Sequence, residues 1–258
     1  MNGDKSMKKL FFVLVSILFL NSSYAQSGTY LGLRVGGGYN SLYNPRWVNP
    51  EGADNMIKKY DVLGTFYGVE LLHNFKDVNV GIKSGFIQRT YKYNMSVNYV
   101  TPGEFFSEYT INVNEIPLIF QFRSEKMNTR RSISAFTIGH YYEIGLQYQI
   151  TSAMEASSYI GTNVEDKTVT DLMPYYKKGT IAPVIGIGMG HFAFGRLQIL
   201  HGLRLTYTIG DFQEDKDFEF FQPGNNFTGW EKDYMATNLF SFTYILSVNI
   251  GIYGKEKI

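Results

Sequence analysis

The chain has 258 residues, a formal net charge of +1 at pH 7 and no cysteine. The lack of cysteine excludes a disulfide framework and a lipid-modified N-terminal cysteine, and the balanced charge gives no reason to expect a nucleic-acid partner. Aromatic residues make up 16% of the chain and glycine contributes 26 positions, proportions that suit a membrane β-barrel with aromatics at its strand ends and glycine on its inner face.

The N-terminus has the pattern of a secretory signal peptide. Lys8 and Lys9 precede an apolar run from Leu10 to Leu20, and Ala25 is a small residue before the expected cleavage point. The run is shorter than the roughly 20 apolar residues that a transmembrane helix needs, and no other segment approaches that length. We therefore expect residues 1–25 to be removed and residues 26–258 to form a single outer-membrane β-barrel domain.

Eight segments in which apolar and polar residues alternate follow the signal. Alternation with a period of two indicates a β-strand, because successive side chains of a strand point to opposite faces. The connections after the first, third, fifth and seventh segments are long and the others are short, as in barrels with extracellular loops and periplasmic turns. The expected strands are 29–39, 64–75, 78–93, 108–123, 131–151, 180–192, 195–210 and 237–253.

The alternation leaves open which face points outward. Most segments have the roughly 9–11 residues that a membrane strand needs, whereas strands of globular proteins usually have about 5–6. Aromatic residues also gather near both ends of the strands, as in the girdles of membrane barrels. We therefore expect an all-β, eight-stranded, antiparallel, up-and-down transmembrane β-barrel with its apolar face toward lipid. The aromatic residues are Tyr39, Tyr148 and Tyr207 toward the loops and Phe75, Phe122 and Phe136 toward the turns.

The fourth segment changes phase. Its apolar residues alternate on odd positions over 109–113 and on even positions over 116–122. A slip of one residue moves every side chain to the other face, so an extra residue must absorb it. This predicts a β-bulge near Asn114 and Glu115, where Pro117 fits without breaking the ladder.

Three short motifs carry a family resemblance. Residues 114–120 read Asn-Glu-Ile-Pro-Leu-Ile-Phe, residues 138–142 combine glycine with aromatics, and residues 186–190 have the form Gly-x-Gly-x-Gly. In these motifs and its signal peptide the chain resembles the PorT-like outer-membrane barrel family of the Bacteroidota. The resemblance implies an outer-membrane barrel, and the name-giving member of that family is tied to protein secretion across the outer membrane. The chain departs from many barrels in lacking an aromatic residue at its last position.

Seven charged residues fall on the face expected to point inward. An eight-stranded barrel is just wide enough to be filled by its own side chains, and buried charges need partners. We therefore expect a polar network that closes the lumen, with Glu143 and Arg204 as a pair near the middle of their strands. A small conducting pore is the alternative. The seven residues are Arg34, Glu70, Lys83, Arg89, Glu115, Glu143 and Arg204.

The histidines offer the main route to an enzyme. A lipid-modifying barrel needs a serine beside a histidine that a carboxylate orients, and only Ser134 or Ser241 could approach His140 from another strand. We therefore expect interfacial histidines and no enzymatic activity. No metal-ligand spacing occurs, and the acidic run at 211–219 indicates a solvated loop, with a divalent-cation site as the alternative; no cofactor is expected. The four histidines are His73, His140, His191 and His201.

The expected loops hold both tryptophans. Trp47 follows Arg46, and Trp230 lies three residues after Phe227. Exposed aromatics beside arginine are typical anchors of a binding surface, although they equally serve to pack loops or touch lipid headgroups. These four residues are the candidates for recognition.

The sequence thus predicts a non-enzymatic outer-membrane barrel that acts as an adhesion, scaffold or secretion-associated component through its loops or turns. Its expected partners are outer-membrane lipid, lipopolysaccharide and a protein of the envelope. The alternatives are a lipid-modifying outer-membrane hydrolase and a secreted soluble barrel that binds an apolar ligand.

Overall fold

The computed structural model describes residues 28–43, 57–75, 78–98, 104–124, 137–160, 168–193, 197–212 and 237–253. The expected signal peptide lies outside these residues. No described helix is long and apolar enough to cross a membrane. The elements are β1 (Gly28–Tyr43), β2 (Ile57–Asn74), β3 (Val80–Asn98), β4 (Glu104–Arg123), β5 (Thr137–Ile160), β6 (Thr168–Asp171), the 3-10 helix η4 (Met173–Tyr175), β7 (Gly179–Ala193), β8 (Leu197–Tyr207) and β9 (Asn238–Tyr253).

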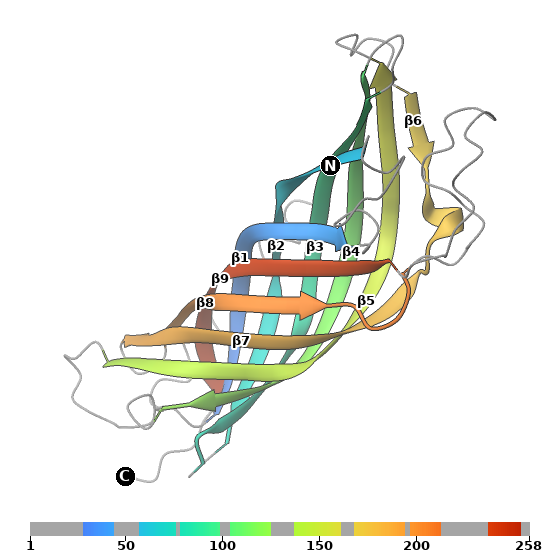
Figure 1. The fold of residues 1–258 in the computed structure, drawn as a ribbon. Coiled ribbons are helices and arrows are strands. Elements are labelled where there is room, and N and C mark those ends of the chain that lie inside the picture. The colour runs from blue at the N-terminus through green and yellow to red at the C-terminus, as the bar shows by residue number, and fades with distance from the viewer. Residues whose placement is uncertain are drawn as a thin grey trace, which may run out of the picture.

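Eight of the strands form one antiparallel sheet that closes into a ring (Figure 1). Neighbours in the chain pair from β1 to β5 and from β7 to β9, β5 pairs with β7, and β9 pairs back with β1. The short β6 adds only to the far end of β5. The predicted eight-stranded, antiparallel, up-and-down barrel is therefore confirmed, and closure removes the open edges of the sheet.

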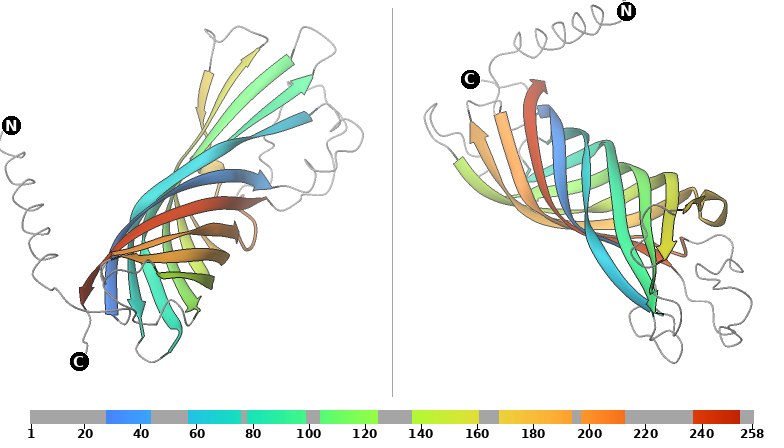
Figure 2. Two further views of the ribbon diagram at one scale, coloured as in Figure 1. Left: turned by 90° about the vertical axis from the view of Figure 1, so that its left-hand side faces the viewer. Right: turned by 90° about the horizontal axis from the view of Figure 1, so that it is seen from above.

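The wall of the barrel is taller on one side. β2 to β5 have 18, 19, 20 and 24 residues, whereas β7, β8, β9 and β1 have 15, 11, 16 and 16. Figures 1 and 2 show the longer strands rising past the shorter ones to the level of β6. The sequence predicted that the fifth strand ends at 151, but β5 continues to Ile160 and pairs there with β6 inside an expected loop.

The apolar face of the strands points outward. In β9 the even positions from Phe242 to Ile250 are exposed, and the odd positions between them are buried. At mid-height the outward side chains of Leu33, Leu118 and Ile144 remain 66%, 56% and 54% exposed. The polar face therefore points into the barrel at this height, which is the opposite of the arrangement in a soluble β-barrel.

The predicted β-bulge near Asn114 and Glu115 is wrong. β3 and β4 keep one register along their whole pairing. The pairing is interrupted around Pro117, but it resumes in the same register, so no residue is inserted there. The shift lies on the neighbouring strand, where Ser152 of β5 is an extra residue opposite Asn112 and Val113. Such an extra residue is a β-bulge, and it reverses the phase of β5 instead of that of β4.

The change of apolar phase in β4 arises because the strand passes between two environments. Every odd position of β4 from Ser107 to Arg123 is buried inside the barrel. Its outward residues are apolar from Ile116 to Phe122 and polar from Glu108 to Asn114, so both faces change character at the same height.

This change follows one row of paired residues along the tall side of the wall. Tyr67 pairs with Gln88, Gln88 with Asn114, and Asn114 with Ile150. We call the part of the barrel between the short turns and this row the lower section, and the part beyond the row the upper section. In the upper section the outward residues of β3 to β5 are polar except Phe106 and Ala153, and Thr90 Oγ1 donates to Asn112 Oδ1 at 2.8 Å there.

Glycines on the inner face make space for large side chains of adjacent strands. A Cβ atom on Gly188 of β7 would lie 2.5 Å from the ring of Tyr141, and one on Gly36 of β1 would lie 2.3 Å from the ring of Phe66. Gly188, the middle glycine of the Gly-x-Gly-x-Gly pattern of β7, is therefore a requirement of interior packing.

Candidate functional site

The lower section holds a chain of five buried charges that runs around the inside of the wall. Arg34 Nη1 of β1 lies 3.2 Å from Glu70 Oε2 of β2, and Lys83 Nζ of β3 lies 3.8 Å from Glu70 Oε1. Lys83 donates to Glu143 Oε1 of β5 at 2.7 Å, and Arg204 Nε of β8 donates to Glu143 Oε2 at 3.2 Å. We call these five residues the lower ion cluster; the structure thus brings Glu143 and Arg204 together.

A second group of charges lies at the border with the upper section. Arg89 donates from Nε and Nη2 to the two carboxylate oxygens of Glu115, at 2.7 and 3.2 Å. Glu115 Oε1 also accepts hydrogen bonds from Gln147 and Gln149, at 3.0 and 3.2 Å. The guanidinium of Arg89 lies 4.5 Å from the centroid of the Phe66 ring. This upper ion cluster is a bidentate pair with its remaining polar atoms largely bonded to neighbours.

Apolar layers separate the two ion clusters and close both ends of the interior. All seven charged residues expected to face inward are at most 4% exposed. The order of positions along the strands places apolar side chains below, between and above the clusters. These layers are Tyr30, Leu72, Tyr141 and Leu200 near the short turns, Phe66, Ile87 and Ile245 between the clusters, and a larger group that includes Tyr91, Ile111 and Met154 above.

Sequence reasoning considered only charged residues and missed their polar neighbours. Gln147 and Gln149 bind Glu115, and Asn40 accepts a hydrogen bond from Arg89 Nη1 at 3.2 Å. Arg123, which is also buried, donates to the carbonyl oxygens of Val78 and Val80 near the short turns. The available signal was strand phase, because these side chains occupy the same inward positions as the seven predicted residues.

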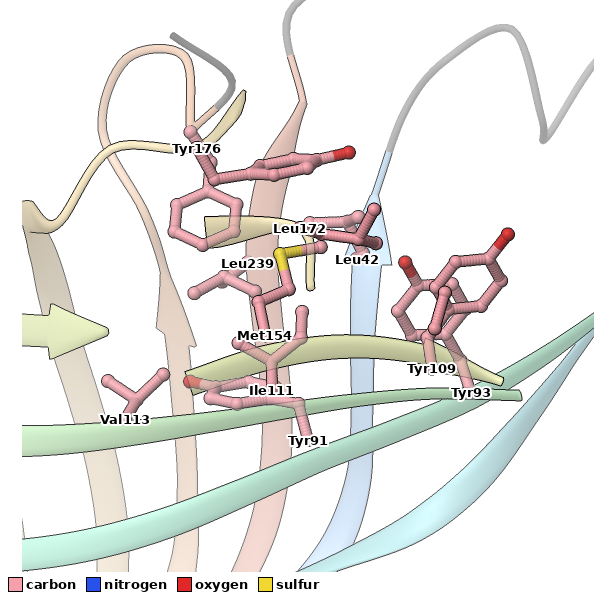
Figure 3. Close-up of a cluster of buried hydrophobic side chains, with 12 residues drawn as sticks. Leu42, Tyr91, Tyr93, Tyr109, Ile111, Val113, Met154, Leu172, Tyr176 and Leu239 are labelled. Atoms are coloured by element: carbon pink, nitrogen blue, oxygen red, sulfur yellow. The ribbon is translucent and has the colours of Figure 1, made fainter. Parts of the chain in front are cut away.

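The upper section has an apolar interior (Figure 3). Tyr93 and Tyr109 stack with their ring centroids 4.6 Å apart, and Tyr176, beyond η4, packs against Phe212. Burial raises the pKa of the Tyr109 and Tyr176 hydroxyls above their usual value, so both stay protonated at neutral pH. The full group is Leu42, Tyr91, Tyr93, Tyr109, Ile111, Val113, Met154, Ala156, Leu172, Tyr176, Phe212 and Leu239. We call it the upper core.

The described residues do not assemble the hydrolase site considered from the sequence. Ser241 is buried inside the barrel, where its hydroxyl lies 2.5 Å from that of Thr206, whereas His140 is exposed on the outer face. Ser134 lies outside the described residues. His73 Nδ1 is 2.9 Å from Thr29 Oγ1, but its other contact within the described chain is the ring of Phe75 and no carboxylate.

The remaining histidines do not form a metal centre with other ligands. His191 Nε2 and His201 Nε2 are 3.0 Å apart on the outer face of β7 and β8. The part of the chain that the structure describes contains no group of three or more histidine, cysteine, aspartate or glutamate side chains that could hold a metal ion. Most of the acidic run at 211–219 lies beyond the described residues, as do the recognition candidates Arg46, Trp47, Phe227 and Trp230.

Comparison with known proteins gave matches among solved structures only. No protein-family model and no curated protein matches the sequence. The outer membrane protein OprG from Pseudomonas aeruginosa is 10% identical, with a TM-score of 0.42, over 88% of this chain and 97% of its own. The N-terminal β-barrel domain of Pseudomonas aeruginosa OprF is 9% identical, with a TM-score of 0.35, over 87% of this chain and 98% of its own. Ail, the attachment invasion locus protein of Yersinia pestis, is 7% identical, with a TM-score of 0.34, over 87% of this chain and 99% of its own.

Proposed function

We propose that this chain is an integral outer-membrane barrel that catalyses no reaction and acts through its loops or turns, as an adhesion, scaffold or secretion-associated component. The observation that carries the proposal is the reversed polarity of the lower section. Apolar side chains such as Leu33 and Leu118 are exposed on its outside, and the lower ion cluster fills its inside. Water around such a wall is unfavourable, whereas hydrocarbon around it buries the exposed apolar side chains.

The closed interior favours a role that does not involve transport through the lumen. The ion clusters are paired across several strands, and apolar layers lie below, between and above them. Eight-stranded barrels have room for side chains and little else, whereas aqueous channels occur in larger barrels. Membership of the PorT-like family stays a prediction, and it favours the secretion-associated role among the three.

Cell fractionation and gel mobility test the membrane proposal. We expect the protein to remain in the membrane pellet after an alkaline wash and to require detergent for extraction. We also expect the unboiled sample to migrate differently from the boiled one, because a closed barrel resists unfolding in the gel. A chain that is monomeric in buffer without detergent would overturn the proposal and favour a soluble barrel.

The action through loops is tested separately on intact cells. We expect chemical cross-linking to capture an envelope protein with the native chain and to lose it in an Arg46→Ala/Trp47→Ala or a Phe227→Ala/Trp230→Ala variant. Lys92→Ala, an exposed change in the upper section, is the matched control. The mass profile of lipid A should be the same with and without the chain, and an altered profile would support the hydrolase instead.

A further inference from the structure

The lower ion cluster contains one more cation than it has carboxylates. Arg34, Lys83 and Arg204 share Glu70 and Glu143, and all five side chains are at most 4% exposed. A buried charge without a counter-charge is strongly unfavourable. The excess therefore calls for a neutralising group within the barrel.

The excess positive charge lies where the chain of ion pairs fails to close around the wall. Positive and negative side chains alternate from Arg34 on β1 through Lys83 on β3 to Arg204 on β8. The chain therefore has an arginine at each end, and β9 is the strand between these two arginines. Lys83, by contrast, contacts both carboxylates.

The inner face of β9 presents one hydroxyl group beside each of these arginines. Ser247 is the register partner of Arg34, and Thr243 is the register partner of Arg204. Both hydroxyls are buried and have no hydrogen-bond partner among the described residues, and the same holds for Arg34 Nε. Ser241, on the same face of the same strand, differs because its hydroxyl contacts Thr206.

Small residues flank this part of β9. Ile245 lies between Thr243 and Ser247 on the inner face and pairs with Gly36 on one side and Gly202 on the other. The two long arginine side chains are therefore the only large polar groups that β1 and β8 offer to this stretch of β9 within the described residues.

We propose that the barrel holds a small inorganic anion inside its wall, beside Arg34 and on the side facing Arg204, with the hydroxyl of Ser247 as a further donor. The anion supplies the missing negative charge and accepts the donor hydrogens that lack partners. A monatomic halide is the simplest candidate, because it supplies the one missing negative charge in the smallest volume. We call this position the β9 anion site.

Anomalous diffraction from bromide tests the site directly. The full chain is refolded into detergent in sodium bromide, so that the ion can enter before the barrel closes. We expect one strong bromine peak inside the barrel, within contact distance of Arg34 and Ser247. Diffraction data with no such peak in the lumen would overturn the proposal, whatever the behaviour of the variants.

Stability measurements on variants test which residues hold the ion. The temperature at which the folded gel band disappears is recorded over a chloride series, with gluconate keeping the ionic strength constant. We expect the native chain to gain stability with chloride, and Ser247→Ala to need at least tenfold more chloride for the same gain. Ser241→Ala should behave as the native chain does, because its hydroxyl belongs to a pair with Thr206.

Arg34→Gln removes the excess charge itself, and we expect the stability of this variant to be independent of chloride. An equal chloride response in the native chain, Ser247→Ala and Arg34→Gln would show a general salt effect and overturn the site. If Arg34→Gln fails to fold, the bromide peak and the comparison of Ser247→Ala with Ser241→Ala still test the proposal.

Discussion

The lower and upper sections of the barrel share strands but differ in which face of the wall is polar. In the lower section β4 presents Leu118 and Phe120 outward and Glu115 and Gln121 inward. A few residues further along, the same strand presents Thr110 outward and Ile111 inward. The polarity of the two faces thus changes with height along the tall side of the barrel, and β3, β4 and β5 each carry both patterns in turn.

The difference shows which force stabilises each section. The upper section resembles a soluble protein, since the upper core buries apolar side chains away from water. The lower section has no apolar centre of that size, and the ion clusters with their polar neighbours fill much of its interior. In the proposed membrane placement, its stability depends on paired charges inside and on lipid outside.

The largest effect should come from unpairing a charge in the upper ion cluster. Glu115→Ala leaves Arg89 buried without its bidentate partner, and we expect a loss of about 3–5 kcal/mol in the free energy of unfolding. Urea unfolding of the barrel in lipid vesicles, followed by circular dichroism, measures the loss. The double variant Arg89→Met/Glu115→Leu should recover much of it, and a double variant as unstable as the single one would contradict this account.

A cavity in the upper core should destabilise the upper section alone. Met154 is fully buried there, so Met154→Ala should cost about 2–5 kcal/mol locally. Hydrogen exchange should accelerate at the far ends of β4 and β5 and stay unchanged below the row of Tyr67 and Gln88. Equal acceleration throughout the barrel would show that the two sections unfold as one unit.

An arginine on the outer face distinguishes the two environments directly. Leu118→Arg places a charge on the exposed apolar wall of the lower section, and we expect a loss of about 2–4 kcal/mol in lipid vesicles. Thr110→Arg, on the same strand and the same face of the upper section, should change stability by less than about 0.5 kcal/mol. Similar losses for the two variants would remove the boundary between the sections.

The smallest effect should come from filling the space that a glycine leaves. Gly188→Ala puts a methyl group 2.5 Å from the Tyr141 ring and 2.3 Å from the His201 carbonyl oxygen, and we expect a loss of about 1–3 kcal/mol. Gly37→Ala is the outward control, because its nearest neighbour would be 3.1 Å away. The temperature at which the folded gel band disappears should fall further for Gly188→Ala.

The number of strands and their order followed from the period-two alternation and the lengths of the connections, and their outward face followed from strand length and the positions of the aromatic residues. The interpretation failed where the environment changed along a strand. The alternation of Tyr109, Ile111 and Val113 was attributed to a slip of register, because a single outer environment was assumed for the whole strand. The true bulge at Ser152 lies in a polar stretch of β5, where hydrophobic alternation gives no signal.

The inner positions of the charged residues followed from strand phase, but their partners did not. Phase alone indicates that Lys83 points inward, whereas its contact with Glu143 depends on β3 and β5 facing the same lumen at the same height. The roles of Gln147 and Asn40 depend likewise on the registers of several strands, which pair residues far apart in the chain.

In the proposed membrane placement, the row of Tyr67, Gln88, Asn114 and Ile150 has a consequence for the depth of the barrel in the bilayer. If the barrel sank by one further pair of residues, Lys92 and Glu155 would approach hydrocarbon; if it rose, Leu118 and Phe86 would approach water. The row therefore sets the depth to which the barrel is inserted in the bilayer. The tall side of the wall then stands at a fixed height and orientation above the membrane. Any partner that docks on this side is held at a set distance from the lipid.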